Sequence, residues 1–138
     1  MTKSFSYKIK VNYEDTDAGG VVYYANYLKY LERARTEALV NIGYSNQKIK
    51  EDFKALIIVK SCNINYKKPA ILEDELIIRT HIILISKTSF VMDQIIIKNK
   101  DTLVEAKVHL VFVSNKIKPI KIPELILSKF KPYFSNIK

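Results

Sequence analysis

Hydrophobic and polar residues alternate strictly near the start of the chain. Aromatic and aliphatic side chains occupy every second position from Phe5 to Tyr13, with serine, lysine and asparagine between them. This period of two predicts a half-buried β-strand with its apolar face against a core. The strand pattern ends at a cluster of acids. Ala18-Gly19-Gly20 then predicts a turn, because glycine tolerates positive φ.

Helical spacing begins near Ala25. Apolar residues then recur at steps of four and three along the chain: Tyr27, Leu31, Ala34, Ala38 and Ile42. This spacing predicts one amphipathic helix over residues 25–42, with an apolar face turned toward a sheet. Asn26 or the residues just before it are candidates for the N-cap. Gly43 occupies the position at which helices commonly end in a left-handed residue.

Four further strand patterns follow the helix, separated by short polar breaks. They cover residues 56–66, 75–85, 90–96 and 104–112. Because breaks this short join antiparallel neighbours, we expect the four strands to form a meander.

Two segments outside these strands have weaker patterns. Residues 44–54 are polar and predict a loop or a short helical turn. Residues 122–127 predict a short helix with Pro123 in its first turn.

The expected elements suit one another, because an antiparallel sheet of about five strands can wrap around one helix and bury its apolar face. We therefore expect an α+β fold. A single domain over residues 1–138 is long enough to bury a substantial core.

Composition supports a folded, water-exposed chain. Hydrophobic residues make up 48% and charged residues 27%, as is typical of globular proteins. No apolar run reaches the roughly 18 residues of a membrane span, and the N-terminus lacks the apolar core of a signal peptide. The single cysteine, Cys62, predicts no internal disulfide and favours a reducing, cytoplasmic location. Its position in a strand pattern predicts a packed, small hydrophobic side chain.

The net charge is +9, and the segment from Lys116 to the end, with six lysines and one acid, contributes more than half of it. A compositional bias with a solvated tail is one explanation. Attraction to a polyanion is the other: nucleic acid, anionic lipid or the phosphates of a nucleotide-bearing substrate. No RNA-binding aromatic motif or zinc spacing accompanies the lysines, so we expect no nucleic-acid partner.

The most distinctive chemistry lies between Glu14 and Asp17, where three acids occupy four positions before Gly19-Gly20 and the helix start. A solvated acidic turn is the ordinary fate of such a run. A helix N-terminus, however, offers free N–H groups and a positive dipole to an anion or a polarised carbonyl. A carboxylate at the same place can act as a general base or a nucleophile.

Other mechanisms find little support. The chain has no Gly-x-Ser-x-Gly elbow and no phosphate-binding Walker loop. His81 and His109 lie in mid-strand without metal-ligand spacing. The Asp-x-Asp-x-Gly run resembles a calcium loop, but Asn26 stands where that loop needs a glutamate. We expect no metal site.

The run Tyr-Glu-Asp-Thr-Asp-Ala-Gly-Gly-Val-Val-Tyr-Tyr-Ala-Asn-Tyr at 13–27, followed by Glu-Arg-Ala-Arg-Thr-Glu at 32–37, resembles hotdog-fold acyl-CoA thioesterases of the YbgC and 4-hydroxybenzoyl-CoA thioesterase type. The likeness extends to Tyr66-Lys67-Lys68-Pro69-Ala70. It implies a five-stranded antiparallel sheet wrapped around one long central helix. It also implies hydrolysis of a short-chain or aromatic acyl thioester of CoA or acyl-carrier protein. A thioester is already activated, so no cofactor is implied.

The resemblance also implies site residues. Asp17, the last acid before the turn, corresponds to the catalytic carboxylate, as nucleophile or general base, and Tyr13 lines the site. YbgC proteins usually carry histidine at the position of Tyr24, whereas the hydroxybenzoyl branch can carry tyrosine there. Among the tyrosines near the helix start, we expect most to be core residues and Tyr24 to be the exception.

The helix start is expected to bind the substrate. Backbone N–H groups near Tyr24 and Ala25 would polarise the thioester carbonyl as an oxyanion hole. The predicted substrate-binding residues, with the two lysines expected to hold CoA phosphates, are Gly20, Val21, Val22, Ala25, Lys68 and Lys87.

A lone hotdog sheet leaves an exposed edge and an incomplete site, so we expect a homodimer or homotetramer. Two alternatives to a thioesterase stay open. A hydratase on the same fold would need an aspartate and a histidine in one site. A non-catalytic protein would bind acyl-CoA or acyl-carrier protein as a partner of lipid-synthesis enzymes.

Overall fold

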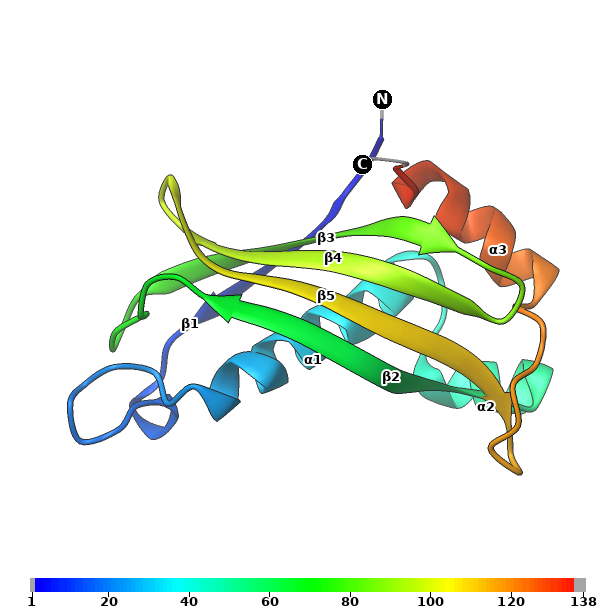
Figure 1. Cartoon of the computed structure of the whole chain (residues 1–138), viewed down its shortest axis with the longest axis horizontal. Helices are drawn as coiled ribbons and strands as arrows, with labels where there is room; N and C mark the ends of the chain where they lie inside the picture. Colours follow the sequence, from blue (N-terminus) through cyan, green and yellow to red (C-terminus); the bar gives the residue numbers. More distant parts are fainter. Residues whose placement is uncertain (1, 136–138) are drawn as a thin grey trace.

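The computed structural model describes residues 2–135, in which a curved sheet wraps around one long helix (Figure 1). The helices and strands follow in chain order: β1 (Phe5–Lys10), α1 (Ala25–Asn41), α2 (Asn46–Phe53), β2 (Ala55–Tyr66), β3 (Glu75–Ile85), β4 (Ser89–Lys98), β5 (Asp101–Ser114) and α3 (Glu124–Phe130). The sheet has five strands, all pairs antiparallel. The expected α+β hotdog architecture is confirmed.

The strand order is β1-β3-β4-β5-β2. The predicted meander is therefore right for β3, β4 and β5 but wrong for β2, which pairs with β5 at one edge while β1 pairs with β3 at the other. Residues 67–74, between β2 and β3, do not form a tight turn. The N–H groups of Lys67 and Lys68 donate to the Leu103 carbonyl, at 2.8 Å and 3.1 Å, and hold the end of β2 beside β5. The chain then passes the ends of β5 and β4 to reach β3, on the other half of the sheet.

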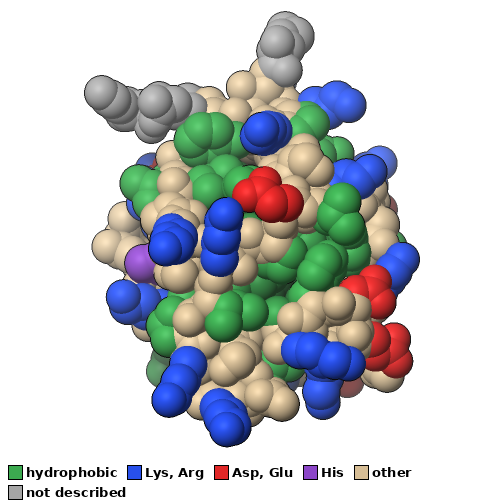
Figure 2. All heavy atoms as spheres, turned by 90° about the vertical axis from the view of Figure 1, so that its right-hand side faces the viewer, with side chains coloured by type: hydrophobic (Ala, Val, Ile, Leu, Met, Phe, Trp, Pro, Cys, Tyr) green, Lys and Arg blue, Asp and Glu red, His purple; other side chains and the backbone are tan. Residues whose placement is uncertain are grey.

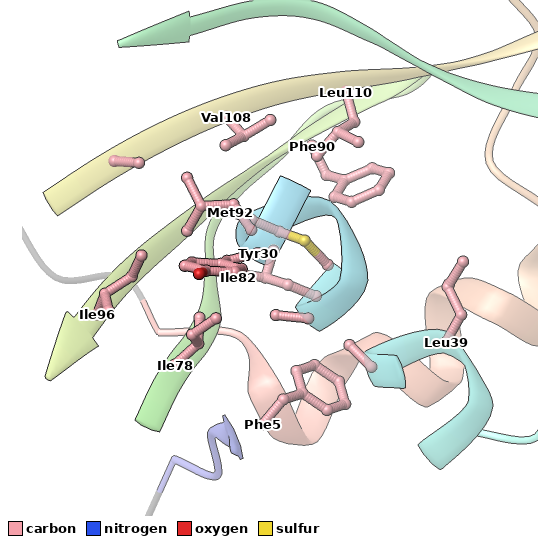
Figure 3. Close-up of a cluster of buried hydrophobic side chains, with 14 of the residues drawn as sticks. Phe5, Tyr30, Leu39, Ile78, Ile82, Phe90, Met92, Ile96, Val108 and Leu110 are labelled. Carbon is pink, nitrogen blue, oxygen red and sulfur yellow. The ribbon is translucent and has the colours of Figure 1, made fainter. Parts of the chain in front are cut away.

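The core lies between α1 and the inner, concave face of the sheet. α1 buries one side, as its spacing predicted: Tyr27, Tyr30, Leu31, Ala34, Ala38 and Leu39. Alternate residues of the strands face this side, and Figure 3 shows Ile78, Ile82, Met92 and Ile96 gathered around Tyr30. Each fully buried side chain of this size contributes about 1.5–3 kcal/mol.

A buried glutamine ties α1 to the middle of the sheet. Gln94 on β4 and Thr80 on β3 are fully buried. The Gln94 amide nitrogen donates to the Leu31 carbonyl at 3.1 Å and to the Thr80 hydroxyl at 3.0 Å. Its oxygen accepts a hydrogen bond from the Arg35 guanidinium at 3.0 Å. These bonds fix the position of α1 on the sheet, because a buried amide left without partners is unfavourable.

Helix ends agree with the sequence in part. Gly43 follows α1 with φ of 95°, in the left-handed region that favours glycine. Asn26 does not cap the helix start; its side chain donates instead to the Asp15 carbonyl at 2.8 Å. The segment predicted as a loop or short turn contains α2, an eight-residue helix whose N-cap is Ser45.

The C-terminal helix is also present. α3 begins directly after Pro123 rather than before it and buries Ile126 and Phe130. Lys138, counted above in the basic C-terminal segment, lies outside the described residues. None of the helices in residues 2–135 is both long and apolar enough to span a bilayer.

β2 forms an edge of the sheet, and its inner face is only partly covered. α1 packs mainly against β1 and β3. Val59 and Tyr66 on β2 consequently remain 48% and 45% exposed. The prediction that Cys62 is a packed core residue is wrong for the same reason: its side chain is exposed.

Candidate active site

The loop between β1 and α1 closes on itself through backbone hydrogen bonds. β1 ends at Lys10, so Tyr13 does not continue the strand; it begins a short 3-10 turn over Tyr13–Asp15 and is 82% exposed. Farther on, the Asp17 N–H donates to the Val21 carbonyl at 2.9 Å, and Thr16 pairs with Val22 as an isolated bridge. Asp17 thus lies at the turn of this loop. The loop leads directly into the start of α1 (Figure 1).

The Asp17 carboxylate is exposed and held by one hydrogen bond. Its Oδ1 accepts the Gly19 N–H at 2.8 Å, and its backbone carbonyl accepts the Gly20 N–H at 3.0 Å. Gly20 has φ of 80°, as the predicted glycine turn requires. In the described part of the chain, Oδ2 has no hydrogen-bond partner. One carboxylate oxygen is therefore oriented by a hydrogen bond, while the other is free to contact a ligand.

Asp15, two residues earlier, has a different environment. It is only 9% exposed, and its Oδ2 accepts the Asn12 N–H at 2.9 Å. Its backbone carbonyl accepts the Tyr23 N–H at 3.0 Å, beside the bond from Asn26. Asp15 therefore shapes the loop, whereas Asp17 is available to a ligand. The sequence pattern did not distinguish the two acids; the structure does.

The loop is attached to the segment that connects β2 and β3. The Val22 N–H donates to the Ala70 carbonyl at 2.8 Å, and Val21 pairs with Ile71 as an isolated bridge. The Ala70 N–H in turn donates to the Tyr27 hydroxyl at 2.9 Å. Val21 and Val22, predicted as substrate-binding residues, thus also hold the loop against residues 70–71.

Asp74 supports this attachment and was not predicted as a site residue. Its carboxylate, 9% exposed, accepts the Ile71 N–H at 2.9 Å and lies 2.8 Å from the Lys98 ammonium. Asp74 follows Glu73 and precedes Glu75 in an acidic run, so nothing in the sequence separates it from its solvated neighbours. Its contact with Lys98 arises only when β3 pairs with β4.

The start of α1 offers two backbone donors. Across residues 2–135, no carbonyl or side-chain oxygen accepts the N–H group of Tyr24 or Ala25. The next two N–H groups, of Asn26 and Tyr27, do have acceptors in the preceding turn. The positive end of the helix dipole adds to the attraction of the two open donors for an oxyanion.

Beside these donors lies a hollow of about 240 Å³ that we call the tyrosine hollow. It is lined by Val22, Tyr24, Tyr27, Tyr66, Lys67, Lys68 and Pro69. The Tyr24 and Tyr27 rings lie 6.2 Å and 5.6 Å from the ring of Tyr66. Tyr24 is 61% exposed, which agrees with the expectation that it lies outside the core. Tyr27 is buried, as expected of a core residue, whereas Tyr23 is exposed. Burial raises the pKa of Tyr27.

The two predicted lysines lie at different places. Lys68 lines the tyrosine hollow, 3.5 Å from Asp101 on the surface. Lys67, which the sequence analysis did not select, lines it too. Lys87 lies in the turn between β3 and β4, at the end of the sheet opposite Asp17, so one chain does not bring Lys87 to the site. At that end, basic side chains surround an apolar area (Figure 2).

Both histidines lie on the outer face of the sheet. His81 stands between the buried, inward-facing residues Thr80 and Ile82, and its ring is 4.0 Å from Asp93. His109 likewise alternates with buried residues of β5. The sheet separates both rings from α1. The hydratase alternative, which needs a histidine beside the aspartate, therefore has no support from this arrangement.

Known proteins are similar to this chain in sequence and in fold. The chain matches the Thioesterase-like superfamily over residues 11–130. It is 41% identical over 132 residues to the acyl-CoA thioester hydrolase YbgC of Escherichia coli, covering 94% of this chain and 98% of that protein. The acyl-CoA thioesterase YbgC of Haemophilus influenzae is 35% identical over 131 residues, covering 94% and 96%.

Solved structures agree. A probable thioesterase from Bartonella henselae superposes with a TM-score of 0.84 at 31% identity, covering 88% of this chain and all of that one. The resemblance inferred from the motif is thus confirmed over nearly the whole length. The chain belongs to the YbgC family of acyl-CoA thioesterases within the Thioesterase-like superfamily.

Proposed function

We propose that the protein hydrolyses a short-chain or aromatic acyl-CoA to the free acid and CoA, with Asp17 as the catalytic carboxylate. Family membership makes the chain a thioester hydrolase and so favours an enzyme over a non-catalytic binding protein. The observation that carries the proposal is that the loop leading into α1 holds an exposed carboxylate, Asp17, and ends at two N–H groups that lack acceptors in residues 2–135.

The two groups have complementary tasks. Asp17 either attacks the thioester carbon, forming an anhydride that water then hydrolyses, or removes a proton from the attacking water. In both cases the carbonyl oxygen becomes negative, and the N–H groups of Tyr24 and Ala25 stabilise it. The carbon–sulfur bond then breaks, and CoA leaves as the thiolate. The exposed Tyr13 precedes Asp17 in the same loop and would line the site, and Gly20 sets the loop turn.

The tyrosine hollow suits the part of the substrate next to the thioester. Its aromatic walls favour an apolar or aromatic group, and Lys67 and Lys68 can meet the CoA phosphates. Their partners in the structure, Glu105 at 2.9 Å and Asp101 at 3.5 Å, form surface ion pairs. Such exposed pairs are weak, so a phosphate can replace the carboxylate at little cost. An acyl-carrier protein, whose carrier arm ends in a thiol like that of CoA, is an alternative substrate.

A second copy of the chain would complete the site. β2 is a twelve-residue edge strand with open hydrogen-bonding groups, which favours pairing with another strand. Antiparallel pairing of two β2 strands about a two-fold axis places the start of one beside the end of the other. The partner's end of the sheet, which carries the turn of Lys87, would then approach Tyr66 and the tyrosine hollow. We infer a homodimer, or a tetramer of two dimers.

The direct test is hydrolysis of a panel of acyl-CoA thioesters by the purified protein. The rate is measured from the release of the free thiol. The panel should include acetyl-, butyryl-, hexanoyl-, benzoyl- and hydroxybenzoyl-CoA, with an acyl-carrier protein thioester beside them. We expect at least one CoA thioester to give kcat/KM of about 10⁴ M⁻¹ s⁻¹ or more. Absence of thiol release from every member would refute the proposed function.

Tyr24 tests how the oxyanion is held. Tyr24→Phe should change kcat less than about threefold, because the variant keeps both the backbone N–H and the ring that contribute in this account. Tyr24→His should add a pH dependence near neutrality, since an unperturbed imidazole titrates at about pH 6.5. The measurement is kcat/KM across about pH 5 to pH 9. A histidine-like step already present in the wild type, or a severe loss in Tyr24→Phe, would contradict this account.

A further inference from the structure

A second hollow lies beside α1, and none of its lining residues belongs to the loop that carries Asp17. We call it the α1–β2 groove: a space of about 350 Å³ between α1 and the inner face of the sheet, lined by Arg35, Leu39, Val59, Phe90, Met92 and Leu110 among others. Figure 3 shows Phe90, Met92 and Leu110 projecting from the strands toward α1, with Leu39 on the helix side. The strands contribute only apolar residues to its lining, whereas the helix side also contributes Glu32, Thr36 and Asn46. Its one cationic lining residue is Arg35.

The Arg35 guanidinium is half-buried and, in the described part of the chain, has no paired anion. It donates one hydrogen bond, to Gln94, and in residues 2–135 it forms no ion pair with any carboxylate. Burial lowers the pKa of Arg35, and the nearby charge of Glu32 opposes that shift. A guanidinium carries five N–H donors and stays protonated, so most of its hydrogen-bonding capacity is unused. A cation that is partly removed from water and has no paired anion attracts one.

The guanidinium is also held in place. Gln94, its acceptor, is fully buried and is itself fixed by bonds to the Leu31 carbonyl and the Thr80 hydroxyl. A donor whose position is set before the ligand arrives loses less conformational entropy on binding. This is an arrangement suited to recognition of a carboxylate, for which the planar guanidinium provides two parallel donors.

The α1–β2 groove and the tyrosine hollow lie along the same two elements. Tyr24, the N-cap of α1, and Tyr27 of α1 line the hollow, and Arg35 of the same helix lines the groove. On β2, Tyr66 lines the tyrosine hollow and Val59 lines the α1–β2 groove. At 1.5 Å per residue, Tyr24 and Arg35 are about 16 Å apart along the helix, and helical side chains point back toward the N-terminus. A chain extending from the thioester along β2 would therefore bring its far end to Arg35.

Resting on the proposed thioesterase function, we propose that the α1–β2 groove receives the acyl chain and that Arg35 binds a carboxylate at its far end. The preferred substrates are then CoA monothioesters of straight-chain dicarboxylic acids. Arg35 is a specificity-determining residue and takes no part in bond breaking. Glu32, also at the groove, repels the incoming carboxylate and so limits its affinity.

The test compares substrates of equal carbon number that differ only at the far end. Adipyl-, suberyl- and sebacyl-CoA carry a terminal carboxylate; hexanoyl-, octanoyl- and decanoyl-CoA carry a methyl group. For at least one length, we expect kcat/KM of the wild type to favour the carboxylate about tenfold or more. Arg35→Met should lower that ratio by roughly tenfold to a hundredfold, and Glu32→Gln should raise it.

Arg33→Met is the matched control, since Arg33 lies on the same helix with its side chain exposed. It should leave the ratio unchanged. Hydrolysis of methyl-ended substrates without any preference for a carboxylate in the wild type would overturn this inference and leave the proposed function intact. The inference would also be overturned if Arg35→Met lowered kcat/KM equally for the carboxylate-ended and methyl-ended substrates, or if it changed the oligomeric mass. Arg35 would then serve assembly with a second copy of the chain. No hydrolysis of any thioester would instead refute the proposed function itself.

Discussion

Asp17→Asn should reduce acyl-CoA turnover by about a thousandfold or more. The amide keeps the shape of the carboxylate, and its oxygen can still accept the Gly19 N–H that now bonds Oδ1 at 2.8 Å. It lacks a charge, however, and is neither an effective base nor a nucleophile. The loop and the helix-start donors stay in place, so KM should change far less than kcat. Steady-state kinetics with the best substrate of the panel measure both constants.

Glu14→Gln provides the matched control, because Glu14 is an exposed acid of the same cluster. It should retain most of the activity. Asp15→Asn is not equivalent, since Asp15 holds the loop together through Asn12. If a folded Asp17→Asn protein turned over at nearly the wild-type rate, the catalytic carboxylate would have to be another residue.

Gln94→Leu should lower the free energy of unfolding by about 2–4 kcal/mol. The substitution keeps the side-chain size but removes every hydrogen bond of the amide. The Thr80 hydroxyl, the Leu31 carbonyl and the Arg35 guanidinium would each lose a buried partner. Leaving buried polar groups unsatisfied costs more than the hydrogen bonds themselves contribute. Urea unfolding followed by circular dichroism gives the difference.

Gln47→Leu on α2 is the control, because Gln47 is exposed and makes only a 3.5 Å contact with Glu51. Its effect should stay within about 0.5 kcal/mol. Equal stability of Gln94→Leu and the wild type would mean that the buried amide does not hold α1 on the sheet.

Periodicity explains what the sequence could predict of the fold. The apolar stripe of α1, the turn at Gly20 and the cap at Gly43 follow from local spacing and local backbone demands, and all are present. Strand order does not follow from local pattern. An alternating strand shows which side faces the core but not which strand lies beside it, and β2 was consequently placed next to β3 rather than β5.

The sequence likewise predicts only part of the candidate site. The motif pointed to Asp17, yet the separate roles of Asp15 and Asp17 depend on which carboxylate becomes buried, and adjacent acids carry no mark of that. Cys62 illustrates the converse error. Alternation predicts burial of Cys62, but an inward-facing residue is covered only where another element lies over it, and α1 covers β2 only in part. Asp74 and Lys98 meet because β3 pairs with β4, and neither residue's local sequence indicates that contact.

The strand order limits how much of the chain can fold while it is being synthesised. β1, the loop that carries Asp17 and α1 leave the ribosome before β3, but β1 pairs with β3, and the loop rests on residues 70–71. The first part of the chain must therefore wait, with its apolar helix face uncovered, until the middle has been made. The hairpins β3–β4 and β4–β5 close over short distances and form quickly, whereas β1 and β2 must close long loops. A nascent chain stalled before β3 would expose the apolar face of α1, a surface that chaperones recognise.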